Sequence, residues 1–159
     1  MTEPVATTFS GPPTILLLSG PNLGLLGVRE PSVYGTATLA DHVARAGAAA
    51  QANGFALEHV QSEHEGDLVA AVHAARGRVD AIVVNAGALS HYGWSLHDAL
   101  ATFDGLVIEL HLTHPDAREP WRRTSVIAPV ADGAVAGFGG LGYELAVEAA
   151  ARLVKERKA

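Results

Sequence analysis

Short apolar runs alternate along the chain with longer segments in which apolar residues recur every three or four positions. The runs are typical of buried strands, and the periodic segments are typical of helices with one covered face. Apolar strands separated by helices indicate an α/β fold in which a parallel sheet is covered on both faces. Strands are predicted at 14–19, 55–61, 79–84, 106–111 and 134–137, and helices at 39–53, 63–76, 93–103 and 142–157.

Polar residues at the predicted helix starts support these boundaries. Thr38 with Asp41, and Ser62 with Glu65, have the spacing of capping boxes, in which two side chains satisfy free backbone N–H groups of the first turn. Five strands over residues 14–159 suit the flavodoxin-like doubly wound parallel sheet of order 2-1-3-4-5.

Composition restricts the class of protein. The 159 residues are 48% hydrophobic and 18% charged with a formal charge of −6, as in an ordinary compact domain. There is no cysteine, which excludes disulfides, thiolate metal ligands and cysteine nucleophiles. The basic cluster at 155–158 is too short for a nucleic-acid surface, and no apolar run has the length of a membrane span. We expect one catalytic or binding domain over 14–159 that contacts neither nucleic acid nor membrane.

Residues 1–13 differ from the rest of the chain. They contain three prolines and have neither the basic start nor the apolar stretch of a signal peptide. We therefore expect a disordered N-terminal extension at 1–13 and a cytoplasmic location.

The loop after the first strand is the first place to look for chemistry, because ligands of doubly wound sheets bind beyond the carboxyl ends of the strands. This loop, 20–35, is unusually long and contains Arg29 and Tyr34. A phenol has an ordinary pKa of ~10, but one guanidinium ~4 Å away contributes ~4 kcal/mol toward the phenolate at an effective dielectric of ~20. Tyr34 is thus a candidate base. The alternative is a packing tyrosine beside a surface arginine.

The loop after the third strand begins with Asn85 and reaches His91. An amide at a strand end can bind a ligand through both its N–H and its C=O, or it can form an Asx turn. His91 is a candidate donor, and Asp98, seven residues further on, is expected on the same face of the same helix. The alternative is a turn followed by two solvated side chains.

The fourth strand ends with Glu109 and His111, whose side chains point to the same side because residues alternate along a strand. A carboxylate beside an imidazole fixes its tautomer and favours its protonated form, which makes His111 a candidate general acid. Arg118, Arg122 and Arg123 follow, and a bidentate arginine there could hold a polar substrate. The alternative is a structural ion pair followed by surface arginines.

Two further patterns have simpler explanations. Residues 137–142 match G-x-G-x-x-G, but only one terminal helix follows, without the later strand and acidic residue of a dinucleotide site. We expect a tight turn with close helix–sheet packing there. His111 and His114 have a possible metal-ligand spacing, but Pro115 follows and no third ligand is evident, so no metal is expected.

Taken together, the loops resemble those of the type II 3-dehydroquinate dehydratases, in family order and over most of the chain. The resemblance implies a cofactor-free, flavodoxin-like enzyme that reversibly dehydrates 3-dehydroquinate to 3-dehydroshikimate, in the shikimate pathway or in quinate breakdown. It also implies a homododecamer of four trimers. The matching segments are Gly20-Pro21-Asn22-Leu23-Gly24, Arg29-Glu30-Pro31, Tyr34-Gly35, Gln61-Ser62 with His64-Glu65-Gly66, Asn85-Ala86-Gly87 with Leu89-Ser90-His91, Glu109 with His111, and Ala117-Arg118-Glu119 with Arg122.

The resemblance implies five catalytic residues by position. Tyr34, as tyrosinate, removes the C2 proton beside the ketone, and Arg29 keeps Tyr34 ionised. Asn22 holds a water that stabilises the enolate of this anti elimination. His111 protonates the departing C1 hydroxyl, and Glu109 orients His111.

The resemblance also implies the contacts that hold the substrate. Its carboxylate binds Asn85 and two backbone amides, its ring hydroxyls bind a histidine and an arginine, and one residue reaches the site of a neighbouring subunit. In that order the implied residues are Asn85, Leu112 and Thr113, then His91 and Arg122, and finally Asp98.

One segment departs from the family pattern. After His91 the family usually continues with Thr-Ser, whereas this chain has Tyr92-Gly93-Trp94. The departure leaves open the start of the next helix and the trimer contact, and it motivates a related hydroxy-ketone as an alternative substrate. An alternative from another class is a non-catalytic, flavodoxin-like module that binds a nucleotide or flavin. A yellow protein would favour that module, but the first loop features an arginine and a tyrosine and is not rich in the serines and threonines that bind phosphate.

Overall fold

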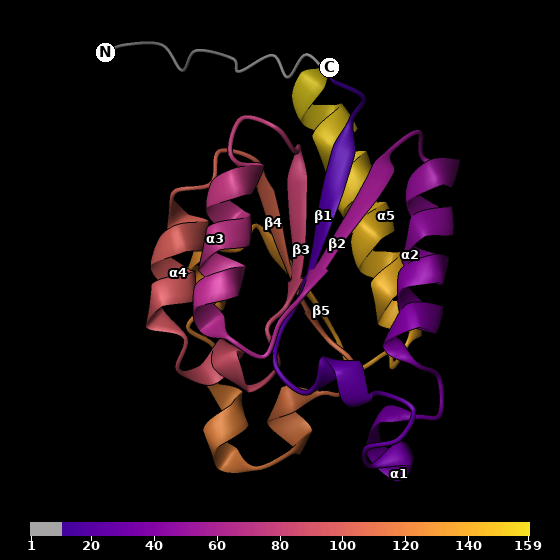
Figure 1. The fold of residues 1–159 in the computed structure, drawn as a ribbon, viewed down its shortest axis with the longest axis vertical. Helices are drawn as coiled ribbons and strands as arrows, with labels where there is room; N and C mark the ends of the chain where they lie inside the picture. The colour runs from indigo at the N-terminus through magenta and orange to yellow at the C-terminus, as the bar shows by residue number, and fades with distance from the viewer. Residues whose placement is uncertain (1–10) are drawn as a thin grey trace.

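The fold is a parallel sheet held between two pairs of helices (Figure 1). A computed structural model describes residues 11–159. The strands are parallel and follow the order β2-β1-β3-β4-β5, so the doubly wound topology expected from the sequence is confirmed. A disordered extension is expected at 1–13, and residues 1–10 of it lie outside the described residues. The strands are β1 (Thr14–Ser19), β2 (Ala56–Gln61), β3 (Ala81–Asn85), β4 (Leu106–His111) and β5 (Gly133–Ala136).

Two hydrophobic cores, one on each face of the sheet, hold the layers together. Alternate residues of β1 enter different cores, with Ile15 and Leu17 on one face and Leu16 and Leu18 on the other. None of these four side chains is more than 1% exposed. The central strands are therefore mostly apolar, as expected for a parallel sheet covered on both faces. The edge strands β2 and β5 are only partly buried.

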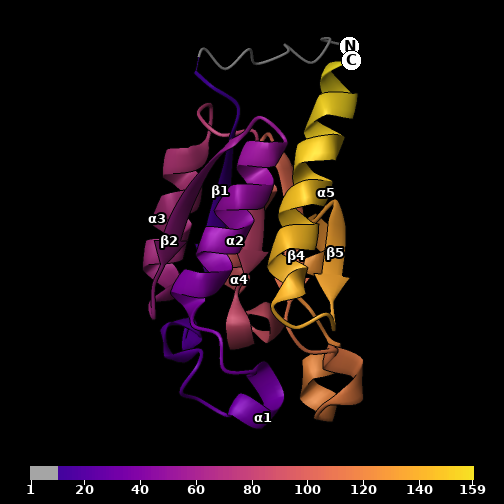
Figure 2. The ribbon, with the colours of Figure 1, turned by 90° about the vertical axis from the view of Figure 1, so that its right-hand side faces the viewer.

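The helices cover the two faces in pairs. Helices α2 (Leu39–Ala52) and α5 (Leu141–Lys158) lie side by side on one face, and α3 (Glu65–Ala75) and α4 (Trp94–Ala101) lie on the other (Figures 1 and 2). Buried alanines on α2 and α5 allow these two helices to approach closely. Within residues 11–159, no helix is long and apolar enough to cross a membrane.

One of the two predicted capping boxes is present, and the prediction of the other is wrong. Thr38 and Asp41 form the box expected at the start of α2. At α3, the Ser62 hydroxyl instead donates to Asp67, and the Glu65 carboxylate accepts the Leu96 N–H at 3.0 Å. Glu65 therefore caps α4 from the neighbouring helix, because a carboxylate is stabilised by the free N–H groups of a helix start.

The Tyr92-Gly93-Trp94 segment is a break between two helical pieces. A 3₁₀ helix, η2 (Gly87–His91), ends before it, and α4 begins at Trp94. A Cβ on Gly93 would lie 2.7 Å from the Leu89 carbonyl oxygen, so the break requires glycine there. The expectation that His91 and Asp98 share one helix face is therefore wrong.

Three connections gather beyond the carboxyl ends of the strands. Figures 1 and 2 place the first loop and the segment after β4 at this one end of the sheet, away from the end of α5. The first loop, expected to lack structure, contains two short helical turns. The short elements here are η1 (Leu23–Leu25) and α1 (Pro31–Tyr34) in the first loop, η2 after β3, and η3 (Pro115–Ala117), η4 (Pro120–Arg123) and η5 (Ala128–Val130) after β4.

The G-x-G-x-x-G segment forms the turn from β5 into α5, as expected. Gly137 and Gly139 have φ of +90° and +57°, a backbone region that favours glycine. A Cβ on Gly142 would lie 3.0 Å from Cδ1 of Leu110 in β4, so the start of α5 packs closely on the sheet.

Candidate functional site

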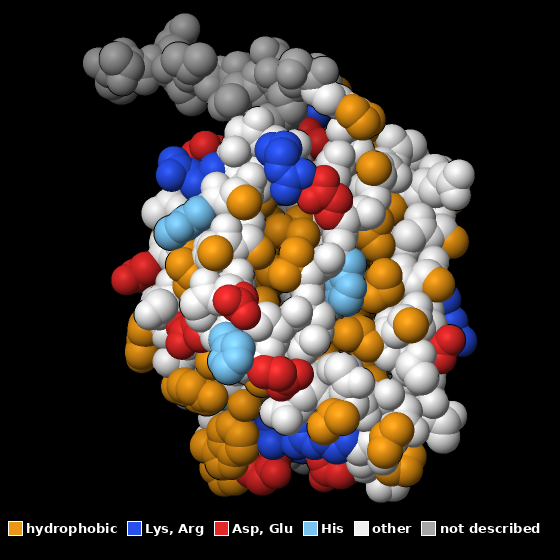
Figure 3. Space-filling view, viewed as in Figure 1, with side chains coloured by type: hydrophobic (Ala, Val, Ile, Leu, Met, Phe, Trp, Pro, Cys, Tyr) orange, Lys and Arg blue, Asp and Glu red, His pale blue; other side chains and the backbone are white. Residues whose placement is uncertain are grey.

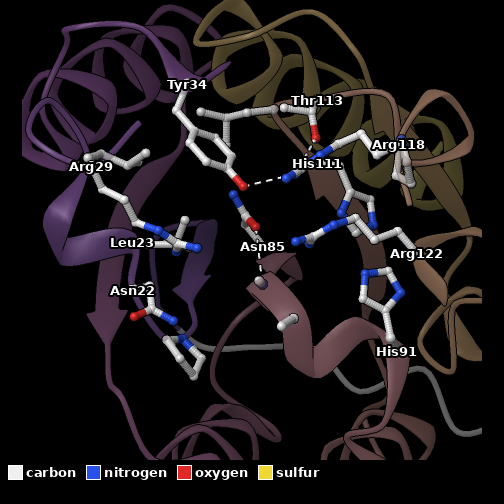
Figure 4. Close-up of a pocket in the computed structure, with 16 residues that line it drawn as sticks. Asn22, Leu23, Arg29, Tyr34, Asn85, His91, His111, Thr113, Arg118 and Arg122 are labelled. Atoms are coloured by element: carbon white, nitrogen blue, oxygen red, sulfur yellow. Dashed lines mark hydrogen bonds between the residues drawn. The ribbon is translucent and has the colours of Figure 1, made fainter. Parts of the chain in front are cut away.

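A cavity lies at the carboxyl ends of β1, β3 and β4, where the sequence predicts the site (Figure 4). It encloses about 700 Å³ including its open mouth. Of the eleven residues that the sequence predicts, Glu109 lies behind the cavity wall and Asp98 lies elsewhere. The nine that line the cavity are Asn22, Arg29, Tyr34, Asn85, His91, His111, Leu112, Thr113 and Arg122.

Arg118 is the direct partner of the Tyr34 hydroxyl. Its Nη1 donates to Tyr34 Oη at 2.9 Å and to the Thr113 hydroxyl at 3.2 Å (Figure 4). The Arg118 side chain is 18% exposed, so its charge is only partly screened by water. A guanidinium that donates to a phenol oxygen favours the ionised form of that phenol. From the sequence, Arg118 is only one of three possible substrate ligands, and no local pattern predicts its contact with Tyr34.

Arg29 contacts the same tyrosine less directly. Its guanidinium carbon lies 5.8 Å from the centre of the Tyr34 ring, and its Nε lies 3.2 Å from the Glu30 carboxylate. The Arg29 side chain is 41% exposed. Arg29 therefore adds positive charge near Tyr34, while the hydrogen bond to the hydroxyl comes from Arg118.

His111 and Glu109 form the pair expected at the end of β4. The His111 Nε2 lies 2.8 Å from Glu109 Oε1, and the same carboxylate oxygen accepts the Ser125 hydroxyl at 2.6 Å. Because the carboxylate accepts, Nε2 carries the hydrogen and Nδ1 is left for the cavity. Glu109 is 2% exposed, so it acts on His111 and does not reach the cavity itself.

His91 is oriented by the segment after β4. Its Nδ1 lies 2.7 Å from the Thr124 carbonyl oxygen, so Nδ1 carries a hydrogen and Nε2 is an acceptor when the ring is neutral. Trp121 packs edge-on against the His91 ring, with centroids 5.2 Å apart. His91 can therefore accept a hydrogen bond from a hydroxyl group in the cavity.

Asn22 is held in a left-handed conformation at φ +68°. Its backbone N–H donates to Glu63 Oε2 at 2.8 Å, and Gln61 donates to the other oxygen of the same carboxylate. The hydrogen bond from Asn22 has the larger effect, and together the two bonds lower the pKa of Glu63 below its ordinary value. The Glu63 carboxylate thus fixes the backbone from which the Asn22 amide reaches the cavity.

Arg122 is the third arginine of the cavity wall. Its Nε donates to Glu119 Oε2 at 2.7 Å, and its guanidinium stacks on the Trp121 ring at 4.1 Å. The same Glu119 oxygen lies 3.5 Å from Arg118 Nε. Glu119 therefore sets the spacing of the two arginines.

The cavity combines groups suited to acid–base chemistry on a polar, anionic molecule. An arginine-bound phenol and a carboxylate-bound imidazole are a candidate base and a candidate acid. Arg118, Arg122 and Asn85 are candidate ligands for an anion. Among residues 11–159, no three histidine, aspartate or glutamate side chains are grouped to hold a metal ion.

Asp98 lies on the outer part of α4 and is exposed. It does not line the cavity of its own chain. Its expected contact with the substrate of a neighbouring subunit stays a prediction.

Comparison with known proteins adds a family likeness to this geometry. A family model described as dehydroquinase class II matches residues 13–151. A 3-dehydroquinate dehydratase of Bacillus licheniformis is 52% identical over 135 residues, which are 85% of this chain and 93% of that protein. A catabolic 3-dehydroquinase of Aspergillus clavatus is 48% identical over 144 residues, 91% of this chain and 96% of that protein. The crystal structure of a type II dehydroquinase from Propionibacterium acnes matches with a TM-score of 0.84 at 39% identity, covering 87% of this chain and 96% of that one.

Proposed function

The chain belongs to the class II dehydroquinase family, and we propose that it dehydrates 3-dehydroquinate to 3-dehydroshikimate with Tyr34 as base. The observation that carries the proposal is the cavity itself. It places an arginine-bound phenol and a carboxylate-bound imidazole on the walls of one opening. Such a pair suits the removal of a proton beside a ketone followed by the loss of a hydroxyl group.

The first step forms an enolate. The Tyr34 phenolate, stabilised by Arg118 and by the charge of Arg29, takes the C2 proton of the substrate. The electron pair of the broken C–H bond moves onto the ketone oxygen. Asn22 holds a water that donates to this oxygen, because an enolate forms at a useful rate only where its charge is stabilised.

The second step expels water. The enolate electrons return to form the C1–C2 double bond, and the C1 hydroxyl leaves with a proton from protonated His111. Hydroxide is a poor leaving group, so this proton is needed. Glu109 and Ser125 hold the imidazole in place during the transfer. Solvent then moves the proton from Tyr34 back to His111, which restores the starting enzyme.

Substrate binding uses the polar groups between these two side chains. We assign the substrate carboxylate to Asn85 and to the backbone amides of Leu112 and Thr113, and the ring hydroxyls to His91 and Arg122. The tautomer of His91 set by Thr124 suits this role, because Nε2 accepts a hydroxyl hydrogen. Glu119 holds Arg122 ready for the same purpose.

The proposal is tested by mixing the purified protein with 3-dehydroquinate and following the ultraviolet absorbance of the conjugated enone product. We expect turnover without added metal or cofactor. A folded protein that forms no enone would contradict the proposal. A flavin-dependent rise in thermal stability, with no enone formed, would instead favour the alternative of a non-catalytic flavin-binding module.

We expect Arg118→Met to reduce turnover at pH 7 by about 10- to 100-fold, the range for loss of a hydrogen bond to a charged group. The control is Arg123→Met, an exposed arginine outside the cavity wall. Equal turnover of the Arg118→Met and Arg123→Met enzymes would contradict the role of Arg118.

We further propose a homododecamer of four trimers in which Asp98 reaches a neighbouring cavity. Tyr92 and Trp94 at the start of α4 and Trp121 in η4 after β4 are aromatic side chains that are 59%, 63% and 52% exposed. Figure 3 shows hydrophobic side chains gathered on this side of the molecule, over the start of α4 and the segment after β4. Exposed apolar patches of this kind mark protein interfaces. Asp98 lies on the same helix α4.

Light scattering should therefore give the mass of twelve chains of 16.5 kDa. Asp98→Ala should keep that mass while turnover falls about tenfold, the size of one lost charged contact. A fully active monomer would contradict this proposal.

The pathway is a separate matter. Relatives include both 3-dehydroquinate dehydratases and catabolic 3-dehydroquinases, and one reaction serves synthesis and breakdown alike.

A cytoplasmic location stays a prediction, which the fractionation of cells that make the protein would test.

A further inference from the structure

Behind the cavity, Asn85 makes a buried hydrogen bond to a residue that the mechanism does not use. Asn85 ends β3 and is 3% exposed. Its Nδ2 donates to the hydroxyl of Tyr143 at 3.2 Å, and its Oδ1 accepts the Gly87 N–H at 3.3 Å. Figure 4 shows Asn85 at the back of the cavity with its bond to the η2 segment. The amide is therefore held at both of its polar atoms.

These two hydrogen bonds fix the orientation of the Asn85 amide, that is, the positions of Oδ1 and Nδ2. A tyrosine hydroxyl can donate or accept, but a backbone N–H can only donate, so the Gly87 N–H requires Oδ1 on its own side. Nδ2 then faces Tyr143 and uses one of its two hydrogens there. The other hydrogen is left for the cavity. Asn85 thus offers the cavity a neutral donor, which suits an anionic ligand.

Tyr143 is itself rigidly held. It lies near the start of α5 and is completely buried in the core between α5, α2 and the sheet. Its ring stacks on His42 of α2 with centroids 4.9 Å apart and an interplanar angle of 5°. Burial raises the pKa of Tyr143 to about 12, so its hydroxyl stays neutral through the working pH range. Such a fixed, neutral hydroxyl is a constant partner for Nδ2.

We propose that Tyr143 is a positioning residue for substrate binding, because its hydroxyl holds the Asn85 amide in the orientation that presents an N–H to the cavity. The inference rests on the proposed function, in which Asn85 holds the substrate carboxylate. Without the hydroxyl, Nδ2 would have an unpaired hydrogen in a buried place, which favours rotation of the amide away from its binding orientation.

The kinetic test is Tyr143→Phe, which removes the hydroxyl and keeps the ring against His42. We expect KM to rise by roughly tenfold, the size of one buried hydrogen bond, while kcat changes by less than about threefold. KM does not depend on the fraction of protein that is folded, so the result holds even if the yield falls. An unchanged KM in active Tyr143→Phe enzyme would overturn the proposal.

A double-mutant cycle separates positioning from a general loosening of the core. In an Asn85→Ala background, Tyr143→Phe should change KM by less than about twofold, because its effect passes through Asn85. If the variant raised KM equally in both backgrounds, Tyr143 would have only a structural role.

A substrate-free measurement distinguishes this inference from the proposed function. The chain has three asparagines, so the side-chain amide signals of Asn85 can be assigned by nuclear magnetic resonance with Asn85→Ala. We expect the Nδ2 hydrogen bound to Tyr143 to exchange with solvent at least about tenfold faster in Tyr143→Phe, since it loses its partner. Equal exchange rates would overturn the positioning role, whether or not the enzyme turns over dehydroquinate.

Discussion

Replacement of Tyr34 by phenylalanine is expected to reduce kcat by about 10³-fold, within the range for loss of a general base. In the first loop, the Tyr34 hydroxyl accepts a hydrogen bond from Arg118 at the cavity wall. Phenylalanine keeps the ring that lies beside Arg29 and Arg118 and removes only the atom that takes the proton. Substrate affinity should therefore stay within about threefold of the original value. Steady-state kinetics and calorimetric binding of dehydroquinate measure the two quantities.

The matched control is Tyr92→Phe, which removes a hydroxyl from an exposed tyrosine outside the cavity wall and keeps the aromatic ring that the proposed interface uses. This control should keep normal turnover. A Tyr34→Phe enzyme with a near-normal rate would remove Tyr34 from the role of base.

The second large effect is expected at His111. His111→Gln should reduce kcat by about 10²- to 10⁴-fold, because glutamine cannot supply the proton that the departing hydroxyl needs. Glutamine can still donate a hydrogen bond to Glu109, so the buried carboxylate is not left without a partner. The protein should therefore remain folded, which a thermal unfolding scan checks.

His114 provides the control for this substitution. It lies three residues further on and is exposed, and it does not line the cavity. His114→Gln should have normal activity. If both histidine variants lost activity together, the two side chains would act as a pair, as in a metal site.

Much of the fold follows from local sequence patterns. Continuous apolar runs identify the central strands, because these strands are buried on both faces. The carboxyl ends of β1, β3 and β4 then define the edge of the sheet where ligands bind. Glu109 and His111 could be paired from sequence alone, since residues two apart on a strand point the same way.

Contacts between distant segments could not be predicted in this way. Arg118 bonds to a tyrosine 84 positions earlier, and no local pattern shows which of several arginines does so. The same holds for Glu65, which caps α4 at Leu96, 31 residues further along the chain. The prediction that His91 and Asp98 share one helix face is wrong because it requires an unbroken helix through Gly93.

Tyr143 is the clearest example of this limit. In the sequence it is one residue of a terminal helix, and its apolar neighbours indicate only a core position. Its bond to Asn85 spans 58 residues and links the core to the cavity wall. Only the packing of α5 on the sheet brings the two side chains together.

Hydrogen exchange shows whether Tyr34 removes the C2 proton before the hydroxyl leaves. His111→Gln enzyme is incubated with dehydroquinate in heavy water, and deuterium at C2 is followed by nuclear magnetic resonance. We expect deuterium to enter C2 stereospecifically without dehydration, because Tyr34 can still form the enolate while the acid for the second step is missing. The additional change Tyr34→Phe should abolish this exchange. Enzyme-dependent exchange that persists without the Tyr34 hydroxyl would contradict the account.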